Sequence, residues 1–244
     1  MNLRDRLILE EYRKDEEQLA LLDKIVGEKI DGIVAESGVR TFSSQHRVKS
    51  EKSLAGKMVR NEGWYDRLTD LTDLVGARII CYFSDDIDRL GELIEKNFVI
   101  DWGECSDKRK LIEANSFGYL SMHYIGSLPK SDEYPEELCR WRFEIQIRTM
   151  LQHVWSDIEH DLGYKSEFGV PRAVLRGFAR VSALLELADD EFVRIRDVMQ
   201  EHTESVRKSI IEDTAADVPI DMVSLAEYVR HNRRFRALLG KMGE

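Results

Sequence analysis

The pattern of apolar and polar residues changes its period inside one stretch, residues 141–165. From Trp141 to Ile147 every second residue is apolar, which predicts a half-buried β-strand. After Thr149 the apolar residues recur every three or four positions, which predicts an amphipathic helix over residues 151–162. The sequence therefore predicts a strand that runs directly into a helix.

The second face of this predicted strand is entirely polar, since it carries Arg142, Glu144, Gln146 and Arg148. Burying such a row without partners would cost several kcal/mol. We therefore expect the row to line a wet, charged cleft. The alternative interpretation is a solvated outer face of an edge sheet.

The same two periods recur along the rest of the chain. Helical spacing over residues 3–36 predicts one long helix or two, packed on one side. Residues 71–83 and 116–128 predict strands, and residues 85–98 predict an amphipathic helix between them. A long helical pattern begins at Pro171, breaks at residues 213–219 and resumes at Met222 with a basic end.

This alternation predicts an α+β fold in which helices flank a mixed β-sheet, with helical extensions at both ends. The domain boundaries that we expect follow the change from mixed to purely helical patterns. They are an N-terminal helical segment at residues 1–40, a core at residues 41–168 and a C-terminal helical extension at residues 169–244.

Composition excludes several classes of protein. Of the 244 residues, 43% are apolar and 34% are charged, and no apolar run approaches the length of a membrane span. The first residues lack the apolar region of a signal peptide, so we expect a cytoplasmic protein without a membrane partner. Cys81, Cys105 and Cys139 have no paired spacing, which indicates reduced structural thiols rather than a disulfide framework or a zinc site.

A net charge of -10 argues against broad binding of nucleic acid, so an anionic ligand needs a local basic patch. Residues 40–60 supply one, because they contain six Lys or Arg residues and a single acidic residue, Glu51. The spacing of Lys49, Ser53, Lys57 and Arg60 predicts one face of a helix that could hold a polyphosphate. The alternative is a basic helical face that is merely solvated.

Four ordered motifs resemble the RelA/SpoT synthetase family. EIQIRT at residues 144–149 precedes the helical pattern W-x-x-x-E-H-x-L-x-Y-K at residues 155–165. The pattern R-x-K-x-x-x-S-x-x-x-K-x-x-R at residues 47–60 is similar to the family's ATP-binding segment. D-x-x-G-x-R at residues 73–78 and G-Y-x-S-x-H at residues 118–123 complete the set. The resemblance covers about half of the chain.

This resemblance implies a fold of nucleotidyltransferase type and a stand-alone small alarmone synthetase. Such an enzyme moves pyrophosphate from ATP to the 3′-hydroxyl of GDP or GTP, which yields ppGpp or pppGpp. It implies that Asp73 and Glu144 are catalytic and hold Mg²⁺, and that Tyr119 stacks on guanine. The implied ATP-binding residues are Arg47, Lys49, Ser53, Lys57, Arg60 and Arg78, and the implied acceptor-binding residues are Tyr119, His123, Gln146 and Arg148.

Some alternatives remain open at this point. Leu120 stands where the family usually has a basic residue, and the C-terminal end is basic, so the acceptor could be the 3′ end of tRNA, as in toxic members with an antitoxin partner. A catalytically silent nucleotide-binding module is a further alternative. Helical spacing also allows a metal site at His153, Asp157 and His160.

The apolar stripe from Val174 to Met199 is longer than a core of this size readily covers. It predicts a homo-oligomer, a dimer or a tetramer, and the resemblance implies the same, since stand-alone synthetases assemble through terminal helices. In the alternative, the stripe folds back onto residues 3–36 of the same chain.

Overall fold

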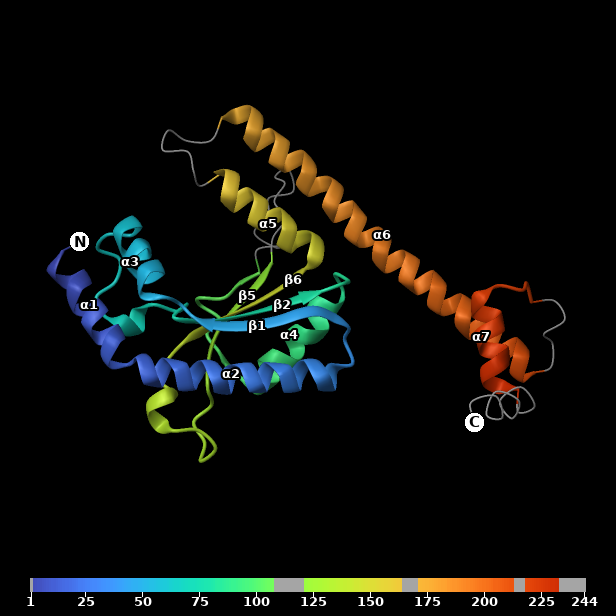
Figure 1. Cartoon of the computed structure of the whole chain (residues 1–244), viewed down its shortest axis with the longest axis horizontal. Coiled ribbons are helices and arrows are strands. Elements are labelled where there is room, and N and C mark those ends of the chain that lie inside the picture. The colour runs from blue at the N-terminus through green and yellow to red at the C-terminus, as the bar shows by residue number, and fades with distance from the viewer. Residues whose placement is uncertain (1, 108–120, 164–170, 213–217, 233–244) are drawn as a thin grey trace, which may run out of the picture. The chain divides into compact units, whose positions relative to one another are not determined.

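The computed structural model describes residues 2–107, 121–163, 171–212 and 218–232 (Figure 1). Contacts divide the chain into two units, residues 1–189 and residues 190–244. The first unit contains the β-sheet and the candidate site. In the second unit, the end of the long helix α6 (Arg172–Ile211) is followed by α7 (Met222–His231), which confirms the predicted final helix. The basic end of the chain, residues 233–244, lies outside the described residues.

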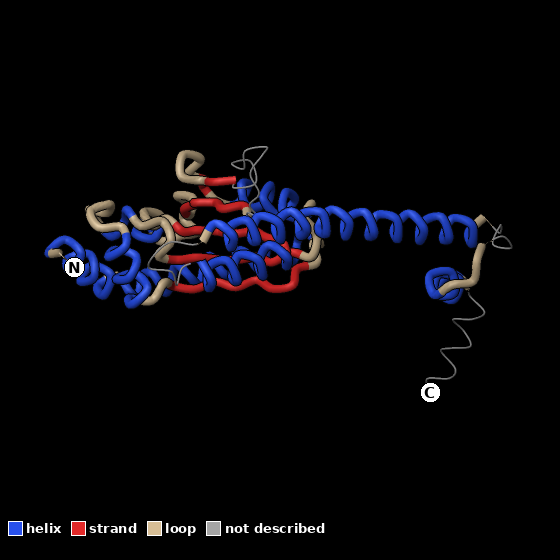
Figure 2. The backbone as a smooth tube through the Cα atoms, turned by 90° about the horizontal axis from the view of Figure 1, so that it is seen from above, coloured by secondary structure: helices blue, strands red, loops and turns tan. Residues whose placement is uncertain are grey.

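Within the described residues the sheet has six strands, which lie side by side in Figure 2. The strand order is β1-β2-β6-β5-β3, and β4 also pairs with β5. Strands β2 and β6 are parallel, whereas the other pairs are antiparallel, so the predicted mixed sheet is confirmed. The strand bounds are β1 Thr41–Val48, β2 Val75–Cys81, β3 Val99–Ile100, β4 Ser106–Asp107, β5 Met122–Ser127 and β6 Phe143–Thr149.

The helical pattern at the N-terminus forms two helices, α1 (Leu3–Lys14) and α2 (Glu16–Ser37). The side chain of Asn2 caps α1, and the two helices are separated at Asp15. Helix α2 ends at Gly38, whose φ of 66° is in the left-handed region that glycine adopts without strain. The other bounds are α3 Glu51–Arg60, α4 Asp86–Asn97, α5 Met150–Gly163 and two short 3₁₀ helices, Leu68–Asp70 and Glu136–Leu138.

The core lies between one face of the sheet and helices α2 and α4, which pack together on that side (Figure 1). Helix α5 lies on the opposite side of the sheet. The alternating apolar residues of β6 enter the core, as the period of two predicts. Fully buried core residues include Leu22, Val26, Leu90, Ile94, Ile79, Phe143, Ile145 and Ile147. Among the described helices, none combines the length and apolar character that crossing a bilayer requires.

The region around residues 41–60 differs from the sequence prediction. Residues 41–48 form β1, an edge strand that the apolar pattern does not predict. Helix α3 begins only at Glu51, because the Ser50 side chain caps it by accepting a hydrogen bond from the backbone of Ser53. Lys49 precedes the helix, and its N–H donates to the carbonyl of Leu74 at 2.7 Å. The prediction that Lys49 shares a helical face with Ser53, Lys57 and Arg60 is therefore wrong.

Candidate active site

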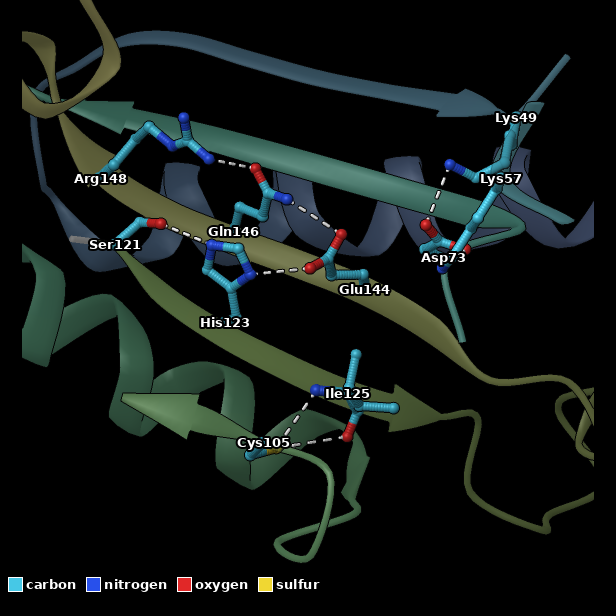
Figure 3. A network of polar contacts seen from close by, with 10 residues as sticks. All are labelled: Lys49, Lys57, Asp73, Cys105, Ser121, His123, Ile125, Glu144, Gln146 and Arg148. Carbon is cyan, nitrogen blue, oxygen red and sulfur yellow. Dashed lines mark hydrogen bonds and ion pairs between the residues drawn. The ribbon is translucent and has the colours of Figure 1, made fainter. Parts of the chain in front are cut away.

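The polar faces of neighbouring strands meet on the side of the sheet away from α2 and α4 (Figure 3). In the parallel pairing of β2 with β6, Gly76 lies beside Glu144 and Arg78 beside Gln146. On β5, His123 is the register partner of Gln146. Since side chains alternate between the faces of a strand, these residues all belong to one polar surface.

A pocket opens on this surface at the N-terminal end of β2. Gly76 has no side chain, and a Cβ built there would approach nothing closer than 4.0 Å, so the glycine leaves space beside Glu144. Both predicted catalytic carboxylates, Asp73 and Glu144, line this one pocket. Its lining residues are Gln45, His46, Arg47, Lys49, Asp73, Gly76, Ala77, Arg78, Glu144 and Gln146.

Asp73 is held by two lysines. Its Oδ2 lies 2.9 Å from Lys49 Nζ, and its Oδ1 lies 2.9 Å from Lys57 Nζ. Burial lowers the pKa of Lys57, but the hydrogen bond and the charge of Asp73 outweigh burial, so the net pKa is raised. Lys57 also lies 5.6 Å from the ring centroid of Tyr65. Both ammonium groups therefore lie at the N-terminal end of β2, in contact with Asp73.

Glu144 lies at the centre of a chain of hydrogen bonds along β6 (Figure 3). Arg148 donates to the Gln146 side-chain oxygen, and Gln146 Nε2 donates to Glu144 Oε2 at 2.9 Å. His123 Nδ1 lies 2.8 Å from Glu144 Oε1, and His123 Nε2 lies 2.5 Å from Ser121 Oγ. Because a carboxylate only accepts, the Nδ1 atom carries a proton, and in the neutral ring Nε2 accepts from Ser121.

Arg148 is a buried cation at the end of this chain of hydrogen bonds, and 4% of its surface is exposed. Burial, followed by the nearby charge of Arg78, lowers the pKa of its guanidinium to about 10. Burial also lowers the pKa of His153 on α5, and the charges of Arg78 and Arg148 lower it further, although Asp157 opposes them. This end of the polar surface therefore favours an anion.

The structure brings most of the predicted site residues together. Arg47, Lys49, Arg78 and Gln146 line the pocket with the two carboxylates, and Lys57 joins them through Asp73. His123 and Arg148 are connected to the pocket through Glu144 and Gln146. Ser53 and Arg60 lie on the exposed surface of α3 and do not line the pocket, and Tyr119 lies outside the described residues.

The surface also contains residues that were not assigned a role from the sequence, and Gln45 and Ser121 are examples. Gln45 lines the pocket from the edge strand β1, where it is the register partner of Arg78. Ser121 precedes β5 and contacts His123. The motif that contains Ser121 gives it the same parity as His123, which is the sequence signal for a shared face.

The chemistry of the two carboxylates suits Mg²⁺, which binds oxygen ligands and commonly takes one or two carboxylates together with substrate phosphates. Asp73 and Glu144 line the same pocket and so meet this requirement. Among the described residues there is no group of three or more His, Cys, Asp or Glu that could hold a metal. The alternative site at His153, Asp157 and His160 is therefore not formed.

Known proteins share this arrangement of strands and helices. The family model described as "Region found in RelA / SpoT proteins" matches residues 46–168. GTP pyrophosphokinase YjbM of Bacillus subtilis is 32% identical over 158 residues, which are 64% of this chain and 72% of that relative.

Solved structures are similar over more of the chain. Small alarmone synthetase 1 of Bacillus subtilis has a TM-score of 0.63 at 25% identity, covering 79% of this chain and 99% of that chain. The structure of that enzyme bound to its product pppGpp has a TM-score of 0.63 at 26% identity, covering 78% and 98%. The family match contains Asp73 and Glu144 and spans half of the sequence. The chain therefore belongs to the RelA/SpoT family.

Proposed function

We propose that this protein is a (p)ppGpp synthetase, which transfers pyrophosphate from ATP to the 3′-hydroxyl of GDP or GTP and releases AMP. One observation carries the proposal: Asp73 and Glu144 line a single pocket together with Arg47, Lys49 and Arg78. Transfer of a pyrophosphoryl group needs such a combination of cations and carboxylates, because charge must be neutralised while two substrates are aligned. The similar proteins are named GTP pyrophosphokinase and small alarmone synthetase.

The donor nucleotide binds in the half of the pocket formed by β1, β2 and the start of α3. Arg47 pairs with Gly76, two positions from Arg78, so the two arginines are diagonal neighbours on one face. Diagonal neighbours on a sheet are about 7–8 Å apart, which leaves room for one aromatic base between two guanidinium planes. Adenine fits this space, and Lys49 and Lys57 contact its phosphates, with Ser53 and Arg60 assigned by the motif alone.

The acceptor binds beside Glu144. The 3′-oxygen of the acceptor forms a bond to the β-phosphorus of ATP while the bond between the α,β-bridging oxygen and that phosphorus breaks, so AMP is the leaving group. Glu144 accepts the proton of the 3′-hydroxyl, and its two oxygens are oriented for this by His123 and Gln146. Arg148 and Gln146 then contact the acceptor or the transferred phosphates, and Tyr119 stacks on guanine by the motif.

Asp73 and Glu144 are the residues that would hold Mg²⁺. When bound, the ion would offset the negative charge that develops on the phosphate oxygens. Both ammonium groups pair with Asp73. A cation bound to Asp73 would take their place as its partner, and Lys49 and Lys57 would then be available to the phosphates. ATP, GDP and GTP are abundant in the cytoplasm, which is the compartment that we assign to the reaction.

We also propose that the protein is a homo-oligomer. An apolar groove of about 710 Å³ runs between α5 and the first half of α6, lined by Val154, Trp155, Ile158, Val174, Gly177, Phe178, Arg180, Val181, Leu184 and Leu185. Several of these side chains are half exposed, and a monomer rarely leaves such an apolar strip to water. Arg180 is the single charged residue of the lining. The groove could therefore bind the apolar stripe of α6, Val174 to Met199, from a second copy of the chain.

A labelling experiment tests the function. Purified protein is incubated with γ-labelled ATP and Mg²⁺, and GDP, GTP, ATP or deacylated tRNA is offered separately. We expect label in GDP or GTP with release of AMP, and no transfer by the Glu144→Gln variant. Label in tRNA would favour the tRNA-modifying alternative and a search for an antitoxin, whereas no transfer to any acceptor would leave a silent nucleotide-binding module.

A further inference from the structure

Helix α1 contacts the donor half of the pocket through one buried aromatic residue. Tyr12 is 5% exposed, and its ring is part of the main core. Its hydroxyl donates a hydrogen bond of 2.8 Å to the backbone carbonyl of Lys49, which lies 37 positions further along the chain. A residue of the first helix thus reaches the backbone of a lysine that lines the pocket.

Lys49 is held on three sides. Its N–H donates to the carbonyl of Leu74 at 2.7 Å, its carbonyl accepts from Tyr12, and its Nζ lies 2.9 Å from Asp73. Leu74 directly follows Asp73, so the contacts with Leu74 and Asp73 both fix the lysine to the segment just before β2. The contact with Tyr12 is the one that fixes it to another element.

The position of Lys49 explains why this hydrogen bond matters. Lys49 lies between the end of β1 at Val48 and the N-cap of α3 at Ser50, so its carbonyl belongs to neither element. Helix α1 also contacts the start of α3 through the pair formed by Arg13 and Glu51. Both side chains of that pair are exposed, and exposed ion pairs contribute little. Tyr12 therefore supplies the buried part of the connection.

We propose that Tyr12 is a positioning residue for the donor nucleotide, which acts by fixing the backbone of Lys49. The proposal rests on the function proposed above, since it takes Lys49 to contact ATP phosphates. Without the hydroxyl, the Lys49 backbone is tethered on one side only, and its ammonium group explores more positions. Donor affinity falls, whereas the acceptor half of the pocket, which is built on β5 and β6, keeps its geometry.

The test variant is Tyr12→Phe, which removes the hydroxyl and keeps the ring. Its affinity for the non-transferable analogue AMPCPP is measured by calorimetry with Mg²⁺, together with steady-state kinetics. We expect about five- to tenfold weaker binding of AMPCPP, the effect of losing one hydrogen bond. KM for ATP rises by the same factor, whereas kcat and the KM of the acceptor change less than twofold, since the contact exists before and during transfer.

Tyr124→Phe is the matched control. The Tyr124 hydroxyl donates to Glu95 Oε1 at 2.8 Å and is also buried, so the same group is removed elsewhere in the core. The two variants should lose similar stability in urea, and Tyr124→Phe should bind AMPCPP like the unchanged protein. Equal affinity of Tyr12→Phe and unchanged protein would overturn this inference alone. Unchanged protein that binds no AMPCPP would overturn the proposed function and this inference with it.

Discussion

Each ring nitrogen of His123 contacts a protein group, Glu144 on one side and Ser121 on the other. The family motif implies that His123 contacts the acceptor, yet both nitrogens are within hydrogen-bond distance of protein atoms. We propose that the imidazole orients the Glu144 carboxylate toward the 3′-hydroxyl. This role predicts a different kinetic signature from that of an acceptor-binding residue.

Replacing His123 by Ala removes the donor to Glu144. If the imidazole orients the carboxylate, we expect kcat to fall by about 10²-fold, the lower range for losing an aligned general base, with little change in either KM. His123→Asn keeps an N–H donor near the Nδ1 position and should regain part of kcat. A raised KM for GDP with unchanged kcat would instead assign His123 to acceptor binding.

Arg148 predicts a conflict between stability and activity. Its pKa is lowered to about 10 from an ordinary value of 12.5, so its charge costs the folded protein stability at neutral pH, where the folded and unfolded forms are both protonated. That cost is relieved only as the pH rises past about 10. Arg148→Met removes the buried charge, and we expect unfolding to require about 1–3 kcal/mol more free energy.

The same Arg148→Met variant should lose at least about tenfold in kcat/KM, because it removes a buried cation that we assign to the anionic substrates. Urea denaturation and steady-state kinetics measure the two effects on one preparation. A variant that is less stable than the unchanged protein would show that the hydrogen bond from Arg148 to Gln146 outweighs the burial of its charge.

At the scale of elements, two glycines of α2 make a matched pair. A Cβ on Gly27 would lie 2.4 Å from Nε2 of His46, whose other ring nitrogen lies 3.0 Å from Asp23. A Cβ on Gly32 would meet nothing within 4 Å. Gly27 therefore allows β1 to approach α2 closely.

We expect Gly27→Ala to destabilise the protein by about 1–3 kcal/mol through overpacking, because the His46 ring must move and give up its contact with Asp23. Gly32→Ala should stabilise by about 0.5–1 kcal/mol, the difference between Gly and Ala inside a helix. Thermal unfolding of the two variants measures the contrast. Equal stabilisation by both would mean that the His46 side chain rotates away at little cost.

Elements with one apolar face could be predicted from the sequence, and the rest could not. Strands β2 and β6 and helix α4 each bury one face, so their periods of two or of three to four are visible in the residues. Helix α5 shows the same helical period, although its apolar residues Val154, Ile158 and Leu162 remain about half exposed. Strand β1 escapes prediction because six of its eight residues are polar, as an edge strand with a solvated face allows. The start of α3 depends on the cap at Ser50, which moves Lys49 from the helix into the connection.

Within the site, parity placed Glu144 and Gln146 on one face of β6, and the pattern placed Arg78 inside β2 and Asp73 just before it. It could not show that Lys49 and Lys57 meet on Asp73, because that contact joins three segments. The contact of Tyr12 with the Lys49 carbonyl could not be predicted from the sequence either, since every residue type has a backbone carbonyl that can accept such a hydrogen bond.

At the scale of the whole molecule, the apolar groove between α5 and α6 predicts the oligomeric state. Leu184 lines it and is 66% exposed. A carboxylate there would have to be buried against a second copy, so we expect Leu184→Glu to lower the mass measured by light scattering at micromolar concentration. Leu21→Glu, on the surface of α2, is the control that should keep the original mass.

A mass equal to one chain for the unchanged protein, constant on dilution, would contradict the homo-oligomer and leave packing within one chain. Loss of folding by Leu184→Glu is recognised from its far-ultraviolet circular dichroism, and Leu184→Ser then repeats the test with a smaller perturbation.

The seven-residue strand β6 directs Ile145 into the core and its two neighbours, Glu144 and Gln146, into the pocket. A substitution on the core face of this strand also affects the pocket, because any backbone displacement that accommodates a new core residue moves both polar neighbours with it. Core substitutions in β6 that adapt the protein to heat or cold should therefore also change its turnover number, even in lineages whose pocket residues never change.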